Sequence, residues 1–284
     1  FVQADSGKNK RYCEKPIINE VPDTLDQKLW PKIENLINNK EKNKNIYSIK
    51  NTDRAVGTRI SYNLYKKYGN NKIEENTICL NFKGSAGQSF GSFGVKGLKL
   101  ILKGDANDYV GKGLSGATIV IKLQEQSDLK SNENTIIGNT VLYGATSGSL
   151  FAEGQAGERF AVRNSGANAV IEGCGSNGCE YMTGGNVVIL GDVGDNFAAG
   201  MTGGMAFIYD KNNQFEKKLN SETIVWQRLE TEYWKNFLKN LVNKHLKETN
   251  SKTSQNILSN FDEEINYFYQ ICPKEMLDKL ENPI

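Results

Sequence analysis

Glycines recur at a nearly constant spacing through the middle of this 284-residue chain. Each of them precedes a short apolar run, such as LKLILK, ATIVIK or NVVILG, that is too short for a helix. The glycines that open these runs lie at intervals of 19, 32, 18, 19 and 19 residues, and they are Gly97, Gly116, Gly148, Gly166, Gly185 and Gly204. The sequence therefore contains an internal repeat of about 19 residues.

The one long interval contains a polar, charged stretch, QEQSDLKSNENT (124 to 135), which is typical of a surface loop. Without this insertion the period is restored. A repeat this short cannot bury its apolar face alone, so its copies must stack on one another. We therefore predict an all-β core formed by a single-stranded parallel β-helix with turns of about 19 residues. Stacking at about 4.8 Å per turn gives a coil on the order of 25 to 30 Å long.

The repeated glycines are predicted to be structural corners of this coil. A β-carbon at a corner would meet the next turn only about 4.8 Å away, and a sharp bend often requires positive φ. Within LKLILK, three leucines (Leu98, Leu100 and Leu102) alternate with Lys99 and Lys103. This alternation predicts that the leucines point into the lumen and the lysines point outward.

Other interpretations of the glycine-rich stretches are possible but less favoured. GKGLSG (111 to 116) and GCGSNG (173 to 178) match a dinucleotide-binding fingerprint, yet a strand-like run follows each where that site needs a helix. GDAND (104 to 108) and GDVGDN (191 to 196) are similar to calcium loops, which require a nine-residue repeat. We interpret aspartates such as Asp105 as caps of backbone N–H groups.

The segment before the repeat, residues 1 to 76, is predicted to be an arm followed by a helix. A short helix over 25 to 37 is expected to be interrupted by Pro31. A longer helix is predicted over about 53 to 68, because apolar residues recur four apart and Gly69 provides a stop signal.

The repeat itself occupies residues 77 to 212, and residues 213 to 284 are predicted to form a helical tail. Aromatic and aliphatic side chains between Trp234 and His245 have helical spacing, and a second amphipathic stretch ends at Pro273. The apolar stripe of this tail is expected to pack on the coil or to cap its open end.

Composition excludes some partners. The net charge of +2 is small and evenly spread, so we expect neither a nucleic-acid nor a membrane partner.

The odd number of cysteines, five, favours free thiols in a reducing compartment. Cys174 and Cys179 lack the further soft ligands that a zinc site needs, so no metal is predicted. Cys79 is expected to fill the lumen. Because the chain begins at Phe1, we expect it to be processed or part of a longer protein.

Few residues are candidates for chemistry. Glu158, Arg159 and Arg163 form the best cluster, and a polysaccharide lyase or hydrolase using the first two is one alternative. The favoured interpretation is a ladder of arginine–glutamate pairs between turns. His245 lies on a predicted helix without a nearby serine or cysteine, so we interpret it as structural.

Several long stretches resemble the C-terminal glycine-rich domain, called GXGXG, of the glutamate synthase large subunit. They include NTDRAVGTRIS, FKGSAGQSFGSFGVKGLKLILKGDANDYVGKGLSGATIVI, IIGNTVLYGATSGSLFAEGQAGERFAVRNSGANAVIEGCGSNGCEYMTGGNVVILG and GDNFAAGMTGGMAFIYD. The resemblance covers roughly residues 22 to 278. It implies a right-handed β-helix, in agreement with the period.

The resemblance also implies that this chain has an architectural role and no catalytic, cofactor-binding or metal-binding residues of its own. FMN and an iron–sulfur cluster belong to another domain of such enzymes. The implied partners are the glutaminase and synthase domains, with a reductase or ferredoxin as a further partner. The β-helix would fix their spacing so that ammonia passes between them. The expected location is the cytoplasm, with a plastid or other organelle left open. A stand-alone GXGXG subunit of another oxidoreductase complex is the remaining alternative.

Overall fold

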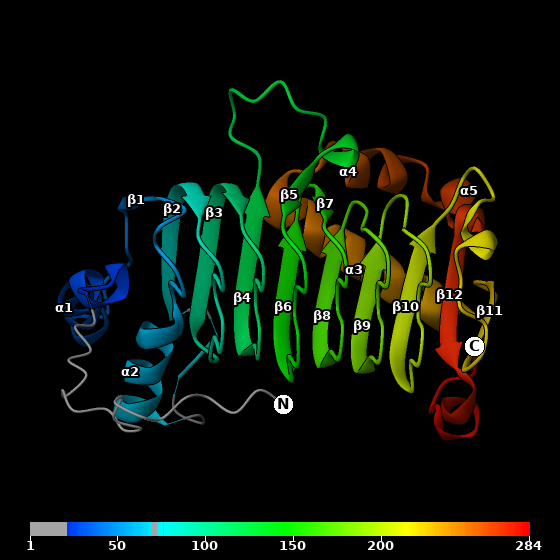
Figure 1. The fold of residues 1–284 in the computed structure, drawn as a ribbon, viewed down its shortest axis with the longest axis horizontal. Helices are drawn as coiled ribbons and strands as arrows, with labels where there is room; N and C mark the ends of the chain where they lie inside the picture. Colours follow the sequence, from blue (N-terminus) through cyan, green and yellow to red (C-terminus); the bar gives the residue numbers. More distant parts are fainter. Residues whose placement is uncertain (1–21, 70–72, 76) are drawn as a thin grey trace, which may run out of the picture.

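The computed structural model describes residues 22–69, 73–75 and 77–284. The predicted N-terminal arm up to residue 21, with Phe1 and Cys13, lies outside these ranges. Figure 1 shows a row of strands, with α1 and α2 at one end and β11 and β12 at the other. The sheet order is β1-β2-β3-β4-β6-β8-β9-β10-β12-β11. The strand bounds are β1 Ile46–Ile49, β2 Ile78–Ala86, β3 Leu98–Ala106, β4 Ser115–Lys122, β5 Thr135–Ile137, β6 Ser147–Ala152, β7 Gln155–Ala156, β8 Ser165–Ile171, β9 Thr183–Ile189, β10 Gly203–Tyr209, β11 Ile224–Arg228 and β12 Phe268–Pro273.

The strands from β2 to β10 form a right-handed parallel β-solenoid, which confirms the predicted fold class. Lys99 of β3 lies opposite Thr118 of β4, 19 positions later. Ala169 of β8 lies opposite Val187 of β9, 18 positions later, so the predicted period is confirmed. The polar insertion follows β4 and projects from the coil before the chain returns in β5 (Figure 1).

The lumen is filled by the alternate side chains of the strands. Leu98, Leu100 and Leu102 are at most 1% exposed, whereas the intervening lysines are only partly buried, as the alternation predicted. The prediction for Cys79 is wrong. It is half-buried and alternates with the buried Ile78 and Leu80, so its thiol lies on the outer face of β2.

A second regular feature lies on the side of each coil that does not carry the main strands. Within each turn, three alternate residues have left-handed backbone, for example Ser89, Gly91 and Phe93 with φ of 67°, 70° and 55°. We call this the left-handed side, and it consists of residues 89–93, 109–113, 140–144, 159–163, 177–181 and 196–200.

Hydrogen bonds in two directions hold the left-handed side together. The middle residue of each triplet donates its N–H to the preceding turn, as Ala161 does to Val141 O at 2.9 Å. Most of the outer residues donate to the following turn, as Arg163 does to Glu180 O at 3.0 Å. Buried N–H and C=O groups need such partners, so this ladder favours the left-handed backbone even where the residue is not glycine.

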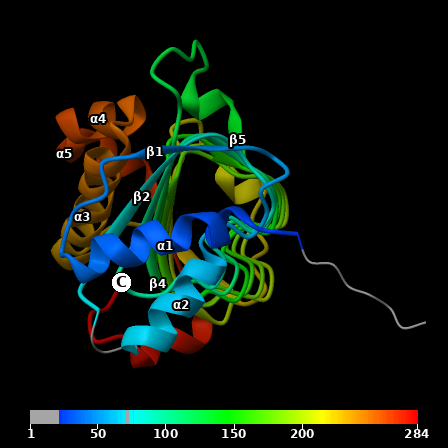
Figure 2. The same ribbon diagram turned by 90° about the vertical axis from the view of Figure 1, so that its left-hand side faces the viewer.

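The outward row of side chains on the sheet forms a second apolar surface. Val120, Phe151, Val170, Val188 and Phe207 occupy the same register position on successive strands. All are at most 4% exposed because helix α3 (Glu232–Thr249) packs across them. Figure 2 shows α3 and α4 along this side of the solenoid and the looped side of the coils opposite.

Helix α1 (Leu25–Asn38) covers the N-terminal end of the coil. The expected interruption at Pro31 is wrong, since the helix continues through it. Thr24 and Gln27 form a capping box that satisfies the first N–H groups, and the buried Ile33 anchors the later turns. These contacts outweigh the single hydrogen bond that a proline removes.

Helix α2 (Thr58–Tyr68) begins later than the predicted residue 53. The chain before it is already in left-handed backbone, with φ of 51° at Ala55 and 98° at Gly57. The buried carboxylate of Asp26, on α1, accepts hydrogen bonds from the N–H groups of Gly57 and Arg59, both at 2.9 Å. A side chain from another helix therefore replaces the local cap.

The tail is not purely helical, which corrects the prediction for residues 213 to 284. After α3, α4 (Lys252–Ser259) and α5 (Phe261–Glu264), the chain forms β12, which pairs antiparallel with β10 and β11. Every residue of β12 is buried. A segment buried on both faces suits a strand within a sheet better than a surface helix. The tail therefore both covers the outer face and extends the end of the sheet.

The glycines that open the strands lie very close to the backbone of the preceding turn. A β-carbon on Gly148 would lie 2.4 Å from Ala117 O, and one on Gly185 would lie 2.2 Å from Ala167 O. Both have positive φ, 101° and 85°. A β-carbon on Gly166 would lie 2.1 Å from Thr146 O, although φ at this glycine is not in the left-handed range.

We predict that the close backbone contact, more than positive φ, makes these glycines necessary. Gly144 is a matched control, since its φ is 65° and nothing lies within 4 Å of an added β-carbon. Gly144→Ala should lower the free energy of unfolding by about 1 kcal/mol through backbone strain. Gly185→Ala should lower it by at least about 3 kcal/mol. Equal losses in urea unfolding would show that Gly185 is not a corner.

Candidate functional site

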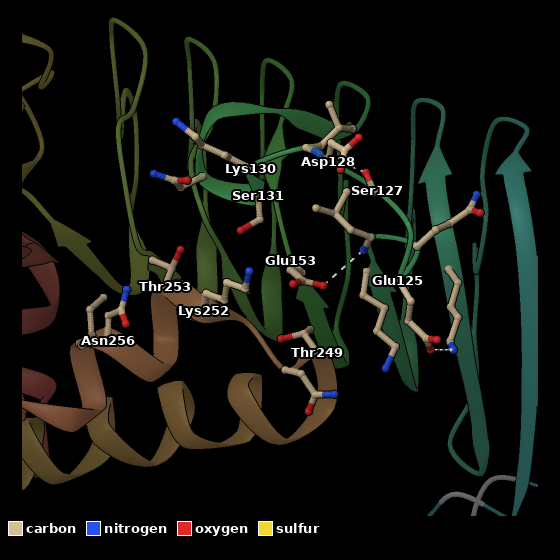
Figure 3. A pocket seen from close by; sticks show the side chains of 18 of the residues that line it. Glu125, Ser127, Asp128, Lys130, Ser131, Glu153, Thr249, Lys252, Thr253 and Asn256 are labelled. Atoms are coloured by element: carbon tan, nitrogen blue, oxygen red, sulfur yellow. Dashed lines mark hydrogen bonds and ion pairs between the residues drawn. The ribbon is translucent and has the colours of Figure 1, made fainter.

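A cavity of about 840 Å³ lies where the insertion approaches the outer face of the sheet and the C-terminal helices. Figure 3 shows side chains from all three elements pointing into it. Among the residues that line it are Lys103 and Lys122 on strands, Glu153 directly after β6, Ser127, Asp128 and Lys130 on the insertion, and Thr249, Lys252, Thr253 and Asn256 on α3 and α4.

Charges of both signs line this cavity, and several are paired with each other. Lys103 Nζ lies 2.5 Å from Glu125 Oε1. Glu153 accepts a hydrogen bond from the N–H of Leu123 at 3.3 Å. Burial raises the pKa of the Glu153 carboxyl, and the nearby Glu172 raises it further. The cavity therefore lacks the single-sign field that would select an anion or a cation.

Beneath the cavity lies a buried polar cluster around Glu172, which follows β8 and is 0% exposed. Ser251 Oγ and Thr253 Oγ1, at the start of α4, donate hydrogen bonds to its two carboxylate oxygens. His245 Nε2, on α3, lies 3.7 Å from Glu172 Oε1, which is too long for a hydrogen bond. These hydrogen bonds tie the start of α4 to the solenoid.

Burial and hydrogen bonding act on these groups in opposite directions. Burial alone would raise the pKa of Glu172, but the groups around its carboxylate, including His245, Ser131 and Ser251, lower it overall. Burial lowers the pKa of His245, and the neighbouring Glu172 only partly opposes this. We therefore treat Glu172 as ionised and His245 as neutral near pH 7.

The cluster contains a serine, a histidine and a glutamate, yet its geometry does not support nucleophilic catalysis. The Ser251 hydroxyl donates to Glu172 and has no hydrogen bond to His245. All three residues are 0% exposed, so a substrate cannot reach them. The sequence predicted no serine partner for His245, and the role of Glu172 was not predicted. The one available signal was a glutamate directly after a buried apolar strand.

Of the residues proposed for sugar chemistry, Arg159 pairs with Glu180 on the adjacent turn, at 3.8 Å. This is one pair of the predicted inter-turn ladder. Arg163 instead lies over the ring of Tyr181, 6.0 Å from its centroid. Glu158 lies next to Arg159 in sequence but does not pair with it in the described part of the chain.

The cysteines in the described part of the chain are all free thiols: Cys79, Cys174, Cys179 and Cys272. Burial raises the pKa of Cys174 to about 12 and that of Cys272 to about 11, so both are protonated and unreactive near neutral pH. Within residues 22–69, 73–75 and 77–284, no three His, Cys, Asp or Glu side chains are placed to hold a metal ion. Over the same ranges, no helix is long and apolar enough to cross a membrane.

The stacked coils of about 19 residues, with glycine-rich left-handed segments, define a distinct class of β-solenoid. The chain belongs to the GXGXG motif family, which matches residues 26–274. It is 54% identical over 284 residues to the glutamate synthase (NADPH) large chain of Azospirillum brasilense. It is 46% identical over 279 residues to ferredoxin-dependent glutamate synthase 2 of Synechocystis sp., and 44% identical over 276 residues to the glutamate synthase (NADPH) large chain of Bacillus subtilis.

These alignments cover nearly all of this chain, 100%, 98% and 95% in the same order. They cover only 19%, 18% and 18% of the relatives. The chain therefore spans about a fifth of the length of the proteins that it resembles.

Because His245 and Glu172 are buried together, we predict that the free energy of unfolding decreases on mild acidification. An unfolded histidine gains a proton below about pH 6.5, whereas His245 in the folded protein stays neutral to lower pH. The unfolded state then binds more protons, so the free energy of unfolding should fall between pH 7 and 5 by up to about 1.4 kcal/mol per pH unit. Glu172, whose folded pKa is also lowered, adds a further loss only below its unfolded pKa.

In the variant His245→Gln, the decrease in the free energy of unfolding between pH 7 and 5 that is due to His245 should be absent. Urea unfolding at several pH values measures it in both proteins. The offset between the two curves is not informative, because the substitution also changes packing. Parallel curves for the two proteins would contradict a neutral, buried histidine.

Proposed function

We propose that this chain is a structural domain of a glutamate synthase and contributes no reacting group to it. The observation that carries the proposal is the end-to-end match, at 54% identity, to a piece that makes up 19% of a glutamate synthase large chain. The solenoid supports it, because a continuous core and a ladder of backbone hydrogen bonds make a stiff spacer.

In this proposal the remaining domains carry out the chemistry. A glutaminase domain releases ammonia from glutamine, and a synthase domain adds it to 2-oxoglutarate with electrons from a reductant. FMN and the iron–sulfur cluster belong to the synthase domain, and the reductase or ferredoxin docks there. The solenoid holds the two domains at a fixed separation. We also propose a reducing compartment, the cytoplasm or a plastid, in keeping with the buried free thiols in the described part of the chain.

The test uses the intact protein that carries this sequence. It should form glutamate from glutamine and 2-oxoglutarate when a reductant is supplied. The double variant Glu158→Gln and Arg159→Gln removes the best candidates for chemistry on this domain. Its kcat should stay within about twofold of the unchanged protein, since a catalytic acid or base contributes about 100-fold or more.

A matched control replaces Glu125, on the exposed insertion, by glutamine. Absence of glutamate formation by the intact protein would contradict the assignment to a glutamate synthase. A loss of 100-fold in kcat for the double variant, with the control unaffected, would contradict a non-catalytic domain.

A further inference from the structure

Three lysines lie side by side on the outer face of the sheet. Lys83 of β2 lies opposite Lys103 of β3, and Lys103 lies opposite Lys122 of β4. Each follows a buried residue that points into the lumen, so all three side chains point outward. Neighbouring strands of a sheet are only about 4.8 Å apart. We call these three residues the lysine ladder.

The solenoid does not require lysine at this position of the turn. In later turns, Leu190 and Tyr209 occupy the corresponding positions, directly after the paired Ile189 and Ile208. Ammonium groups on adjacent strands repel one another at this spacing. Three of them in register are therefore unfavourable unless an anion lies among them.

The chain itself places one anion at the lysine ladder. Glu125, on the insertion, reaches back to the strands, and its Oε1 lies 2.5 Å from Lys103 Nζ (Figure 3). The hydrogen bond and the charge of Lys103 lower the pKa of the Glu125 carboxyl, and the charges of Lys122 and Lys83 lower it further. One carboxylate therefore lies in the field of all three ammonium groups.

This single carboxylate leaves two positive charges uncompensated. Within the described part of the chain, neither Lys83 nor Lys122 has an ion pair. Lys99, which is also on the outer face of β3, provides the contrast, because its Nζ lies 2.6 Å from Glu248 Oε2.

The next carboxylate along the row, Glu153, does not pair with Lys122. It follows Ala152, which lies opposite Ile121, so the two charged residues are at neighbouring positions. Glu153 instead accepts a hydrogen bond from the N–H of Leu123, and burial raises the pKa of its carboxyl. The acidic end of the cavity therefore leaves the lysine ladder positive.

The pair between Glu125 and Lys103 is open to exchange. The Glu125 side chain is 78% exposed and that of Lys103 is 33% exposed, and exposed ion pairs contribute little to stability. A phosphate group carries up to two negative charges, and its oxygens can accept hydrogen bonds from several lysines at once. It therefore suits three point charges in a row better than one carboxylate does.

We propose that the lysine ladder binds a phosphate group, either free phosphate or a phosphate monoester of a small molecule, in exchange for the Glu125 carboxylate. Lys103 and Lys122 line the cavity, and Lys83 lies beyond its lining, so the site is at the edge of the cavity. Binding releases the insertion from Lys103. This site is additional to the proposed function and does not depend on it.

Acetylation of lysines in the intact protein, measured residue by residue by mass spectrometry, tests the proposal. Inorganic phosphate at about 10 mM should slow the acetylation of Lys83, Lys103 and Lys122 at least about threefold. Lys130, on the insertion, is 71% exposed and serves as the reference, and its rate should not change. Potassium chloride at the same ionic strength should not protect the lysine ladder, because it only screens charge.

Glu125→Gln removes the competing carboxylate. It should lower the phosphate concentration that gives half-maximal protection by about threefold. The matched control is Glu133→Gln, which removes another exposed carboxylate of the insertion, 3.1 Å from Lys130 Nζ, and should leave that concentration unchanged.

A double variant tests the lysines themselves. Lys83→Gln together with Lys122→Gln should abolish the protection of Lys103 by phosphate. Lys211→Gln together with Lys252→Gln removes two lysines that line the cavity outside the lysine ladder, and should not.

Glycerol 3-phosphate and succinate distinguish the possible ligands. Protection by glycerol 3-phosphate at lower concentrations than inorganic phosphate identifies a monoester as the ligand, and the reverse order identifies free phosphate. Protection by succinate but not by either phosphate would overturn the proposal. So would equal protection by potassium chloride, or protection of Lys103 that survives in the Lys83 and Lys122 double variant.

Discussion

The hydrogen bonds between successive turns on the left-handed side set the constraint on which the rest of this structure depends. Successive triplets such as 159–163 donate both to the turn before and to the turn after, as Ala161 and Arg163 do. Neither direction can be kept if a turn shifts along its neighbour by one residue. The ladder therefore fixes the register of the coils on one side, while the parallel sheet fixes it on the other.

A fixed register explains why the outer surfaces are so regular. Residues at one position of every turn line up, so Val120, Phe151 and Val170 form a continuous row on which α3 packs. Two residues further along the chain from Phe151 and Val170 are Glu153 and Glu172, where the insertion and α4 meet the coil. The same regularity places aromatic rings together on the opposite side. The chain thus has one face of the solenoid covered by its own helices.

Much of the fold could be predicted from the sequence. The spacing of the glycines gives the length of each coil, and the alternation of apolar and charged residues shows which side chains point inward. The period and the inward leucines follow from them. The left-handed side could not be predicted, since side chains such as Arg159, Thr140 and Tyr181 occupy positions where glycine is the usual signal. The ladder that overrides their preference comes from other turns. Strand β12 was missed for a related reason: its burial depends on pairing with β10, which is remote in sequence.

The site was harder to predict than the fold. Glu172 and Ser251 are 79 positions apart, and only packing of α4 on the solenoid brings them together. Cys79 was placed in the lumen because its apolar neighbours flank it on both sides, and alternation alone cannot say which set of residues points inward. In contrast, a pair of the type formed by Arg159 and Glu180 could be predicted, because side chains on adjacent turns lie next to each other.

Amide hydrogen exchange at the middle positions of the left-handed side tests this account most directly. The N–H groups of Leu142, Ala161 and Cys179 all donate to the preceding turn. They should exchange as slowly as the amides of β8 and β9, because the same cooperative opening of the coil must expose both. Exchange as fast as that of the insertion, with the strand amides still protected, would show that the ladder does not hold the turns together.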